Sequence, residues 1–493
     1  MRLDRLAAAA GYQVADHREY SVTGFAIDHR KVAPGTVFGA FQGARANGEE
    51  FIPAAIAAGA IAVVARPEAR VEGAAHIADP EPRRAFARLA AQFFTPVPET
   101  IVAVTGTNGK TSTVEMTRQL WHMAGERAAS IGTLGVTTPD ESVSTGLTTP
   151  DIVTFLGNLT GLAREGVKHV AYEASSHGLS QFRNEGVRVT AGAFTNLSRD
   201  HLDYHPTMED YFAAKMRLFN EVVADGGTAV VWMDDDWSER ACEHARTRGL
   251  SVLAVGEQGT GIRLLARTPG HLGQELRLSY EGAEYKVRLP LIGAYQAANA
   301  LVAAGLVLAT GGKPAQVFES LARLQPVRGR LERAAITAAG APVYVDYAHT
   351  PDALRAAADA LRPHVSGRLI TVFGAGGDRD KGKRAEMGRV AVETSDAVIV
   401  TDDNPRGEDP AAIRAMVLEG AQGGISGGAR EIGDRREAIA AAIAEAGRDD
   451  IVLIAGKGHE QGQIVGSGKD MRILPFDDVS VARECAAPAG ASA

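Results

Sequence analysis

The residues that most clearly suggest chemistry lie in a glycine-rich segment that follows an apolar run. The β-branched, apolar stretch Ile101–Thr105 stops at a loop and a helix-like segment, and the loop reads Gly106, Thr107, Asn108, Gly109, Lys110, Thr111 and Ser112. Backbone N–H groups in such a loop, with the N-terminus of the following helix, surround phosphate oxygens. Lys110 would reach the outer phosphates, and the Thr111 hydroxyl would help to hold Mg²⁺. This segment therefore predicts a nucleotide-binding site.

The loop is shorter than the general phosphate-binding loop. The usual first glycine position falls on Val104, so only the end of the G-x-x-x-x-G-K-[ST] pattern remains. A sharp turn before an amphipathic helix is the structural alternative. Gly-Lys-Thr at a strand-to-helix junction has few purely structural uses, and this favours nucleotide binding.

Two further segments carry possible metal ligands. Glu173 ends the run KHVAYE, and an acidic residue at a strand end is where an NTPase commonly keeps a Mg²⁺ ligand. A helix N-cap acid is the alternative. His201 lies in the polar run Thr195–His205 and could bind a metal or a phosphate-linked water, although a lone histidine is more often structural. With the glycine loop, these residues predict a magnesium site.

Lys215 occupies an unusual position. The pattern from Met208 to Phe219 places apolar residues at helical spacing, and Lys215 falls inside that stripe, after a capping box at Thr207 and Asp210. A buried lysine is costly unless it is paired or loses its charge. A lysine that snorkels to solvent is the structural alternative. The other interpretation is an amine that is chemically altered or paired at a site.

The last third of the chain has polar residues after several expected strands. Asp346 could take ribose hydroxyls, whereas Arg379 and Arg406 could clamp a carboxylate with two hydrogen bonds each. Glu460, after Gly456, could hold an ammonium group. Each could be an ordinary surface loop, but two arginines with one acid suit a zwitterionic amino-acid substrate.

Composition limits the class of protein. At 493 residues the chain should hold two to four domains, and its net charge of −8 argues against a nucleic-acid surface. No apolar run is long enough to cross a bilayer, so membrane insertion is not expected. Cys242 and Cys485 are far apart, which favours reduced thiols in a cytoplasmic protein without a zinc site or disulfides.

The elements predict an α/β protein of three domains. Residues 1–98 form a small α/β domain, 99–328 a central domain with a mostly parallel sheet, and 329–485 a doubly wound, Rossmann-like domain, before a disordered tail at 486–493. Within the central domain, residues 262–290 alternate strictly and predict antiparallel strands. The motifs above mostly follow expected strands, where ligands bind in open α/β sheets.

Taken in order, these motifs resemble the Mur ligases, the ATP-dependent amide-bond-forming enzymes of peptidoglycan synthesis. The resemblance covers almost the whole chain, and the motifs together are more specific than any single motif. Its motifs are GTNGKT (106–111), EASSHGL (173–179), TNLSRDHLDYH (195–205), YFAAK (211–215), GAYQAANAL (293–301), GRLE (329–332) and DYAHTPDAL (346–354).

The resemblance implies a reaction. The segment Asp403-Asn404-Pro405-Arg406 is similar to that of members that add meso-diaminopimelate to UDP-N-acetylmuramoyl-L-alanyl-D-glutamate, whereas lysine-adding relatives lack the arginine. ATP would phosphorylate the D-glutamyl γ-carboxylate, and the diaminopimelate amine would attack the acyl phosphate. The expected partners are these small molecules, with ATP and Mg²⁺ as cofactors, and the expected state is a monomer.

The resemblance also implies site residues. Lys110, Glu173, His201 and Lys215 would be catalytic, and Thr111, Glu173, His201 and Lys215 would serve the metal, with Lys215 as a carbamate (N6-carboxylysine). ATP would contact the loop 106–112 and Asn299, Arg330 and Asp346. The UDP-muramoyl-dipeptide would contact Ile27, His29, Thr148, Thr149, Ser175, Gln181 and Arg183. Diaminopimelate would contact Arg379, Asp403, Asn404, Pro405, Arg406, Gly456 and Glu460.

One departure concerns the uridine site. The family usually has Asp-Ser-Arg there, and this chain has Asp28-His29-Arg30, so a histidine replaces a small hydroxyl residue. Three alternatives remain open from the sequence: another Mur ligase, including a lysine-adding one, a folylpolyglutamate synthetase-like ligase, or a phosphotransferase with a phosphate-binding loop. Arg406 and the run Thr195–His205 argue against the first two, and the arginine–glutamate pocket argues against the third.

Overall fold

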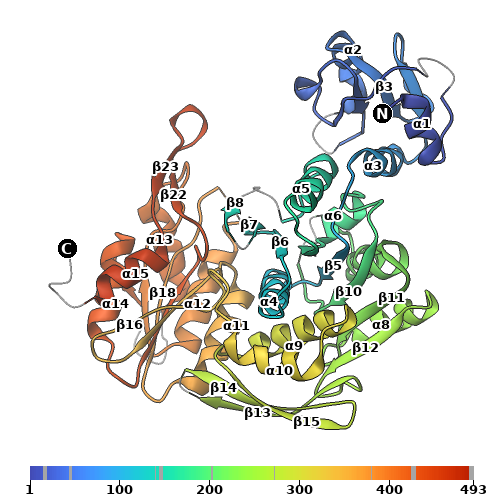
Figure 1. The fold of residues 1–493 in the computed structure, drawn as a ribbon. Coiled ribbons are helices and arrows are strands. Elements are labelled where there is room, and N and C mark those ends of the chain that lie inside the picture. Colours follow the sequence, from blue (N-terminus) through green and yellow to red (C-terminus); the bar gives the residue numbers. More distant parts are fainter. Residues whose placement is uncertain are drawn as a thin grey trace. The chain divides into compact units, whose positions relative to one another are not determined.

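The computed structural model describes residues 1–14, 19–43, 47–138, 140–143, 148–200, 204–270, 272–378, 380–422 and 429–487. The chain divides into two compact units. Unit 1 contains Met1–Arg263 and Asn299–Val317, and unit 2 contains Leu264–Ala298 and Phe318–Ala493 (Figure 1). Most of the predicted tail at 486–493 lies outside the described residues. Among the helices described, none is both long and apolar enough to cross a membrane.

Unit 1 begins with a small four-stranded parallel sheet in the order β1-β2-β3-β4. Its strands are β1 (Gly24–Ala26), β2 (Thr36–Gly39), β3 (Ala60–Ala65) and β4 (Ala75–Ala78). Its helices are α1 (Leu3–Ala9), α2 (Ile52–Ala57) and α3 (Pro82–Phe93), with short 3₁₀ turns at His29–Lys31 and Gly48–Phe51. The expected small α/β fold at the start of the chain is confirmed.

A larger sheet follows, and it carries most of the predicted site. Its unit 1 strands run in the order β12-β11-β10-β5-β9-β6-β7-β8, parallel except at β6–β7 and β7–β8. The strands are β5 (Thr100–Thr105), β6 (Ala128–Gly132), β7 (Gly135–Thr137), β8 (Ser142–Val143), β9 (His169–Glu173), β10 (Val189–Phe194), β11 (Val223–Trp232) and β12 (Ser251–Gly256). The expected mostly parallel central sheet is confirmed.

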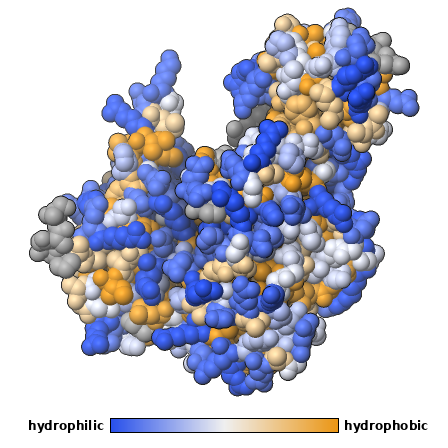
Figure 2. All heavy atoms as spheres, in the orientation of Figure 1, coloured by the Kyte–Doolittle hydropathy of each residue, from blue (hydrophilic) through white to orange (hydrophobic). Residues whose placement is uncertain are grey.

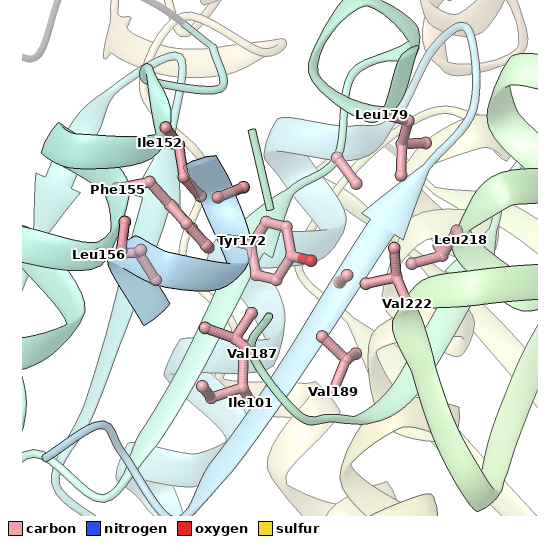
Figure 3. Packing of buried hydrophobic residues seen from close by; sticks show 14 of the residues in the cluster. Ile101, Ile152, Phe155, Leu156, Tyr172, Leu179, Val187, Val189, Leu218 and Val222 are labelled. Atoms are coloured by element: carbon pink, nitrogen blue, oxygen red, sulfur yellow. The ribbon is translucent and has the colours of Figure 1, made fainter. Parts of the chain in front are cut away.

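The helices of this part follow the strands, as a parallel sheet requires. They are α4 (Lys110–Met123), α5 (Ile152–Arg164), α6 (Ser176–Ser180), α7 (Met208–Arg217), which runs into a π-helical turn at Leu218–Val222, and α8 (Ser238–Thr247). The helix α9 (Ala294–Ala309) enters unit 1 at Asn299, and α10 (Pro314–Ser320) follows it. In the core, Tyr172 packs edge-on against Phe155 at 4.9 Å between ring centroids, among aliphatic residues such as Ile101 and Val189 (Figure 3).

Three consecutive strands lead from unit 1 into unit 2 in the sequence, and the first of them pairs parallel with β12 at its start. The strand β13 (Ile262–Gly270) starts beside β12 and continues into unit 2, where β14 (Gly273–Tyr280) and β15 (Ala283–Leu289) follow. The last two pair antiparallel, with Gln274 opposite Leu289. This pairing confirms the antiparallel interpretation of the alternating stretch for these two strands.

Unit 2 holds a six-stranded sheet in the order β16-β17-β21-β18-β19-β20, parallel except at the edge pair β16–β17. Its strands are β16 (Glu332–Ile336), β17 (Pro342–Asp346), β18 (Leu369–Phe373), β19 (Ala397–Val400), β20 (Arg430–Glu431) and β21 (Ile451–Ala455). Its helices are α11 (Pro351–Leu361), α12 (Lys383–Thr394), α13 (Pro410–Gly420), α14 (Arg435–Glu445) and α15 (Asp478–Ala486), with 3₁₀ turns at Leu321–Arg323, Arg362–His364 and Gly468–Asp470. The central strands are buried along their whole length, so the predicted doubly wound pattern is confirmed.

A two-stranded hairpin projects from unit 2. It consists of β22 (Gly462–Val465) and β23 (Arg472–Pro475), and β23 is exposed along its length (Figure 1). In Figure 2 the tip of this hairpin is hydrophilic, and hydrophobic atoms gather nearer its base. Its strand β22 runs beside the segment that contains Arg406, which matters for the site described below.

Candidate functional site

The glycine loop lies at the carboxyl end of β5 and starts α4. Gly106 has φ +148°, and a Cβ there would lie 1.9 Å from Thr195 Oγ1. Gly109, the residue before the helix, has φ +86°, and its Cβ would lie 2.3 Å from Asn299 Oδ1. Both positions therefore need glycine for the close approach as well as for the left-handed backbone. The predicted strand, loop and helix are present.

Residues after β10 hold the loop in place. Thr107 N–H donates to the Asn196 carbonyl at 2.9 Å, and Asn108 N–H donates to Asn196 Oδ1 at 2.9 Å. Thr195 Oγ1 donates to the Asn108 carbonyl at 2.6 Å. The run that the sequence singled out for metal ligands thus also supports the nucleotide loop, because β5 and β10 are parallel neighbours.

Asn299 provides a specific sign that a ligand fits beside this loop. Its side chain lies against Gly109 and is 4% exposed, and its Nδ2 is a buried donor without a hydrogen-bond partner in the described part of the chain. A buried amide without a partner is costly in a folded protein. A buried donor that needs an acceptor, beside a glycine loop at a helix N-terminus, suits a phosphate or another part of a nucleotide.

Two lysines converge on one carbonyl oxygen. Lys215 Nζ donates to the Gly106 carbonyl at 2.7 Å, and Lys110 Nζ donates to the same oxygen at 3.0 Å and to the Thr107 carbonyl at 2.8 Å. Lys215 is 1% exposed, and its Nζ lies 4.2 Å from the centre of the Tyr211 ring. Burial, reinforced by the positive charge of Lys110, holds the pKa of Lys215 well below its usual value.

The helix that carries Lys215 begins as the sequence predicts. Thr207 caps α7 by accepting from Asp210 N–H at 3.1 Å, and the Thr207 hydroxyl donates to the Asp210 carboxylate at 2.8 Å. Lys215 faces inward with Tyr211 and Met216 rather than extending to solvent. The structure thus contradicts the snorkelling alternative and leaves an amine that favours its neutral form.

Glu173 lies beside the start of the glycine loop. In the β5–β9 pair it is opposite Val104, and it is 2% exposed. Its two carboxylate oxygens accept from Thr133, from the backbone N–H at 2.7 Å and from the hydroxyl at 3.3 Å. Glu173 is the last residue of β9, and Ser175 is the residue that caps α6. The N-cap alternative is therefore wrong for Glu173.

The metal site stays a prediction. His201 lies outside the described residues. Among those that the structure describes, no three His, Cys, Asp or Glu side chains gather as a metal-binding group. Mg²⁺ usually binds to one or two carboxylates together with substrate phosphates and water, so a single acid such as Glu173 near a phosphate loop still fits that ion. Thr111 follows Lys110 in the first turn of α4, as its predicted role requires.

Five of the seven residues predicted to bind the UDP-linked substrate lie in one hydrogen-bonded network. Thr149 Oγ1 donates to the Glu173 carbonyl at 2.7 Å and lies 3.0 Å from Ser175 Oγ. Arg183 donates to the Thr149 carbonyl at 2.8 Å and to Gln181 Oε1 at 2.8 Å. Thr148 joins through Thr133, whose hydroxyl lies 3.1 Å away. Side chains from two separate segments, 148–149 and 175–183, thus meet beside Glu173.

Ile27 and His29 lie elsewhere, just after β1. Ile27 is 39% exposed, and the His29 ring stacks on Phe51 with 4.5 Å between centroids and 4° between planes. Asp28 forms an ion pair with Arg30 at 2.7 Å, and hydrogen bonds from Arg30 lower the pKa of Asp28 to about 2. The departure at position 29 therefore places a flat aromatic ring where the family has a hydroxyl.

In unit 2, Arg330 and Asp346 lie close together. Asp346 accepts from Leu331 N–H at 2.7 Å and from Ala348 N–H at 2.9 Å, and burial raises its pKa. The Arg330 guanidinium lies 4.8 Å from the centre of the Tyr347 ring. The structure brings these two predicted nucleotide contacts together within unit 2, and it brings the glycine loop and Asn299 together within unit 1.

The residues predicted to bind an amino acid also converge in unit 2. Asn404 Nδ2 donates to Glu460 Oε2 at 2.8 Å, although the two are 56 residues apart. A Cβ on Gly456 would lie 2.6 Å from Asp403 Oδ2, so the ends of β19 and β21 meet closely there. Arg406, with φ +50°, donates through its guanidinium to the Gly377 carbonyl at 2.9 Å. Pro405 is buried beside them, whereas Arg379 lies outside the described residues.

Sequence reasoning missed several supporting residues. Thr133 holds Glu173, Tyr211 covers Lys215, and Lys457 and Arg384 are wholly buried cations beside the amino-acid pocket. Arg384 donates to both oxygens of Glu408, at 2.8 and 2.9 Å. Tyr211 lay within a family motif, but its contact with Lys215 depends on the fold. The two buried cations gave no signal, because a charged residue next to glycine, such as Lys457, or next to another charged residue, such as Arg384, is ordinarily exposed.

Family models match most of the chain. The Mur ligase middle domain matches residues 104–307, the glutamate ligase domain of Mur ligases matches 329–458, and the model described as the catalytic domain of the Mur ligase family matches 21–94. These three matches include the glycine loop, Lys215 and the segment from Asp403 to Arg406.

Individual proteins match over nearly their full length. The chain is 60% identical to the UDP-N-acetylmuramoyl-L-alanyl-D-glutamate--2,6-diaminopimelate ligase of Zymomonas mobilis subsp. mobilis, over 97% of each sequence. It is 53% identical to the protein of the same name from Bradyrhizobium diazoefficiens, over 93% of each. A solved structure of a ligase of this name is 33% identical, with a TM-score of 0.74, over 98% of this chain and 99% of that one.

Proposed function

The chain belongs to the Mur ligase family and is an ATP-dependent, amide-bond-forming ligase of peptidoglycan synthesis, and from this premise we propose its substrates. It adds meso-diaminopimelate to the γ-carboxylate of the D-glutamyl residue in UDP-N-acetylmuramoyl-L-alanyl-D-glutamate. The observation that carries the proposal is the cluster in unit 2 where Asn404 donates to Glu460 and Arg406 donates to the Gly377 carbonyl, because its one anion and one cation suit a zwitterion. The relatives named above act on these substrates by name.

The proposed reaction has two steps. A γ-carboxylate oxygen attacks the terminal phosphorus of ATP, so an acyl–phosphate bond forms and ADP leaves. The amine nitrogen then attacks the acyl carbon, an amide forms, phosphate leaves and the amine loses its proton. Phosphoryl transfer depends mostly on positioning and on neutralisation of charge. Lys110 and the N–H groups of Gly106–Ser112 supply that neutralisation in this proposal.

Magnesium and a modified lysine complete the proposed phosphate site. Thr111 and Glu173, with His201, would hold Mg²⁺, which would neutralise phosphate charge. A neutral, buried amine is the form that reacts with CO₂, and the surroundings of Lys215 favour that form. Reaction of the amine with CO₂ releases a proton and would leave a carbamate, an anion that supports the metal. We also propose Asn299, Arg330 and Asp346 as contacts to ATP.

The network around Glu173 suits the other substrate. Hydroxyls of Thr148, Thr149 and Ser175, with the Gln181 amide and the Arg183 guanidinium, offer donors to a phosphorylated, carboxylate-bearing molecule. We propose that they bind the UDP-muramoyl-dipeptide and that Ile27 and His29 contact its uridine. In this chain the His29 ring, already stacked on Phe51, would meet the nucleotide with a flat face.

A single assay tests the substrate proposal. The protein is incubated with ATP, Mg²⁺, UDP-N-acetylmuramoyl-L-alanyl-D-glutamate and either meso-diaminopimelate or L-lysine, and phosphate release and product mass are measured. We expect amide product and phosphate with diaminopimelate only. Phosphate release that ignores the amino acid would contradict the ligase reaction, and turnover with lysine alone would contradict the choice of amino acid.

The acyl phosphate has a separate test. With ¹⁸O in the γ-carboxylate of the glutamyl residue, the proposed first step moves one labelled oxygen into the phosphate that is released. We expect phosphate heavier by one ¹⁸O. Unlabelled phosphate together with normal amide product would rule out this intermediate and leave the identity of the substrates unaffected.

A further inference from the structure

Lys457 is a buried cation to which the proposed function gives no role. Its side chain is 0% exposed, and it directly follows β21, between Gly456 and Gly458. Burying an ammonium group is costly unless acceptors surround it. A lysine in a glycine-rich turn ordinarily points to solvent, so its inward position requires an explanation.

The two glycines account for the inward turn. Gly456 has φ +117° and Gly458 has φ +55°. A Cβ on Gly456 would lie 2.6 Å from Asp403 Oδ2, and one on Gly458 would lie 2.6 Å from Tyr347 Cβ. The chain therefore passes too close to the ends of the neighbouring strands for any larger residue. This backbone path directs the Lys457 side chain toward the carboxyl end of the unit 2 sheet, where Asp403 and Asn404 lie.

The ammonium group meets three acceptors, which matches its three N–H donors. Lys457 Nζ donates to Asn404 Oδ1 at 2.9 Å and to Glu460 Oε2 at 3.3 Å, and it lies 3.7 Å from Asp403 Oδ1. All three acceptors belong to the residues proposed to bind the amino acid. Lys457 thus lies behind that pocket rather than in an unrelated part of the core.

These contacts fix one oxygen of Glu460. Its Oε2 accepts from Lys457 and also from Asn404 Nδ2 at 2.8 Å, whereas the side chain as a whole is 32% exposed. Asn404 is held in turn, because its Oδ1 accepts from Lys457 and from Ile464 N–H at 2.9 Å. The other Glu460 oxygen, Oε1, receives neither bond and is the one available to a substrate ammonium.

The same contacts set the charge of the pocket. Asp403 and Glu460 carry two negative charges and Lys457 carries one positive charge, so the three together carry one net negative charge. One uncompensated carboxylate matches one ammonium group on the substrate. Without Lys457, two nearby carboxylates would repel each other.

We propose that Lys457 is a positioning and specificity-determining residue for the amino-acid substrate. It orients Glu460 through one carboxylate oxygen and compensates one of the two negative charges of Asp403 and Glu460. This inference rests on the proposed function, but it requires only that the pocket binds a zwitterionic amino acid and not that this is diaminopimelate.

The test compares Lys457→Met with wild type in steady-state assays that vary each substrate separately. We expect KM for the amino acid to rise by about thirtyfold, the usual effect of removing one partner of a buried charge pair. We expect KM for ATP and for the UDP-linked substrate to stay within roughly twofold, because Lys457 contacts neither proposed site. An unchanged KM for the amino acid, or an equal rise in all three, would overturn the proposal.

Two further variants separate positioning from folding. Lys457→Met leaves Asp403 without its cation, so Asp403→Asn with Lys457→Met restores the charge balance. We expect this double variant to fold with a melting temperature near that of wild type and to bind the amino acid more weakly than Asp403→Asn alone. Binding by the folded double variant as tight as that of Asp403→Asn alone would contradict the proposal, even if Lys457→Met alone does not fold.

A double-mutant cycle tests whether Lys457 acts through Glu460. If it does, Glu460→Gln with Lys457→Met should weaken amino-acid binding little more than Glu460→Gln alone. Fully additive effects would contradict this mechanism. If wild type uses another zwitterionic amino acid, the proposed function fails, and the same comparison is then made with that amino acid.

Discussion

At the scale of the residue, the glycines of the phosphate loop show how closely the chain must approach itself. Gly106 combines a positive φ with a Cβ position 1.9 Å from Thr195 Oγ1. Gly125, at the far end of α4, also has a positive φ of +92°, but a Cβ there would meet nothing within 4 Å. A larger residue would strain the backbone at both positions, but it would collide with a neighbouring side chain only at Gly106.

We predict that Gly106→Ala loses nucleotide binding and that Gly125→Ala does not. Both changes impose backbone strain of roughly 1–3 kcal/mol, but only the first displaces the loop from Thr195. Calorimetric titration with ATP and thermal unfolding of both variants check this. If Gly106→Ala bound ATP as wild type does, the loop would not be the phosphate site.

Lys215 offers a second prediction at this scale. Lys215→Met should lower turnover by about a hundredfold or more, since a positioned charged group at a phosphoryl-transfer site contributes at that level. Wild type prepared without CO₂ should gain activity when bicarbonate is added. Turnover is the measurement, and ¹³C NMR with labelled bicarbonate should show a carbamate. Full activity of Lys215→Met, independent of bicarbonate, would exclude the carbamate.

The lowered pKa of Lys215 also predicts a pH dependence of stability for the unmodified protein. Unfolding returns the amine to a pKa near 10.5, so between its folded pKa and 10.5 the unfolded chain binds the extra proton. The contribution of Lys215 to the free energy of unfolding therefore rises with pH in that window. Denaturant unfolding of wild type and Lys215→Met in CO₂-free buffers should show a smaller rise for the variant.

At the scale of the element, α7 is the helix that positions Lys215, and its start depends on Thr207. The Thr207 side chain accepts from Asp210 N–H and so caps the N-terminus of α7. We predict that Thr207→Ala lowers the free energy of unfolding by about 1 kcal/mol, the usual cost of losing an N-cap. Thr207→Ser keeps the hydroxyl and should match wild type. Chemical denaturation measures both, and equal stability of all three proteins would mean that the cap contributes nothing.

The parallel strands explain why motifs far apart in sequence meet. Glu173 lies beside Val104 because β9 and β5 are neighbours, and Thr195 reaches the glycine loop because β10 lies on the other side of β5. In a parallel sheet the carboxyl ends of neighbouring strands share one edge, so each loop there contacts the next. Local sequence patterns indicate the strands, whereas their order in the sheet follows from packing.

At the scale of the whole molecule, an ion-pair network within unit 1 links the small N-terminal sheet region to the central part. Arg84 on α3 donates to Glu185 at 2.9 Å and to Glu221 at 2.9 Å, and Arg217 on α7 also donates to Glu221 at 2.8 Å. Hydrogen bonds from Arg217 lead the causes that lower the pKa of Glu221. The contribution of this network to the free energy of unfolding should therefore depend on pH.

An acid whose pKa is lowered by folding stabilises the protein above its unfolded pKa, and this stabilisation is lost as the pH falls through its folded pKa. We predict that Glu221→Gln is less stable than wild type at pH 7, by about 0.2–1 kcal/mol for a partly exposed pair. The difference should begin to shrink as the pH falls below 4.5, the usual pKa of the group, and should be lost once the pH has passed its lowered, folded-state pKa. Glu165→Gln, at an exposed helix end, is the control. Denaturation across this pH range measures the effect, and a constant difference would contradict it.

The sequence by itself determined the α/β class, the parallel central sheet, the glycine loop and the unusual position of Lys215. These depend on local spacing, on glycine and on helical or strand periodicity, which short segments carry. Only the tertiary structure decided that Lys215 and Lys110 share the Gly106 carbonyl, although Lys215 is 109 residues from Gly106. It also decided that Lys457 turns inward to hold Glu460 and Asn404. The charge and partners of a buried group depend on which strands become neighbours, and this is fixed only when the whole chain packs.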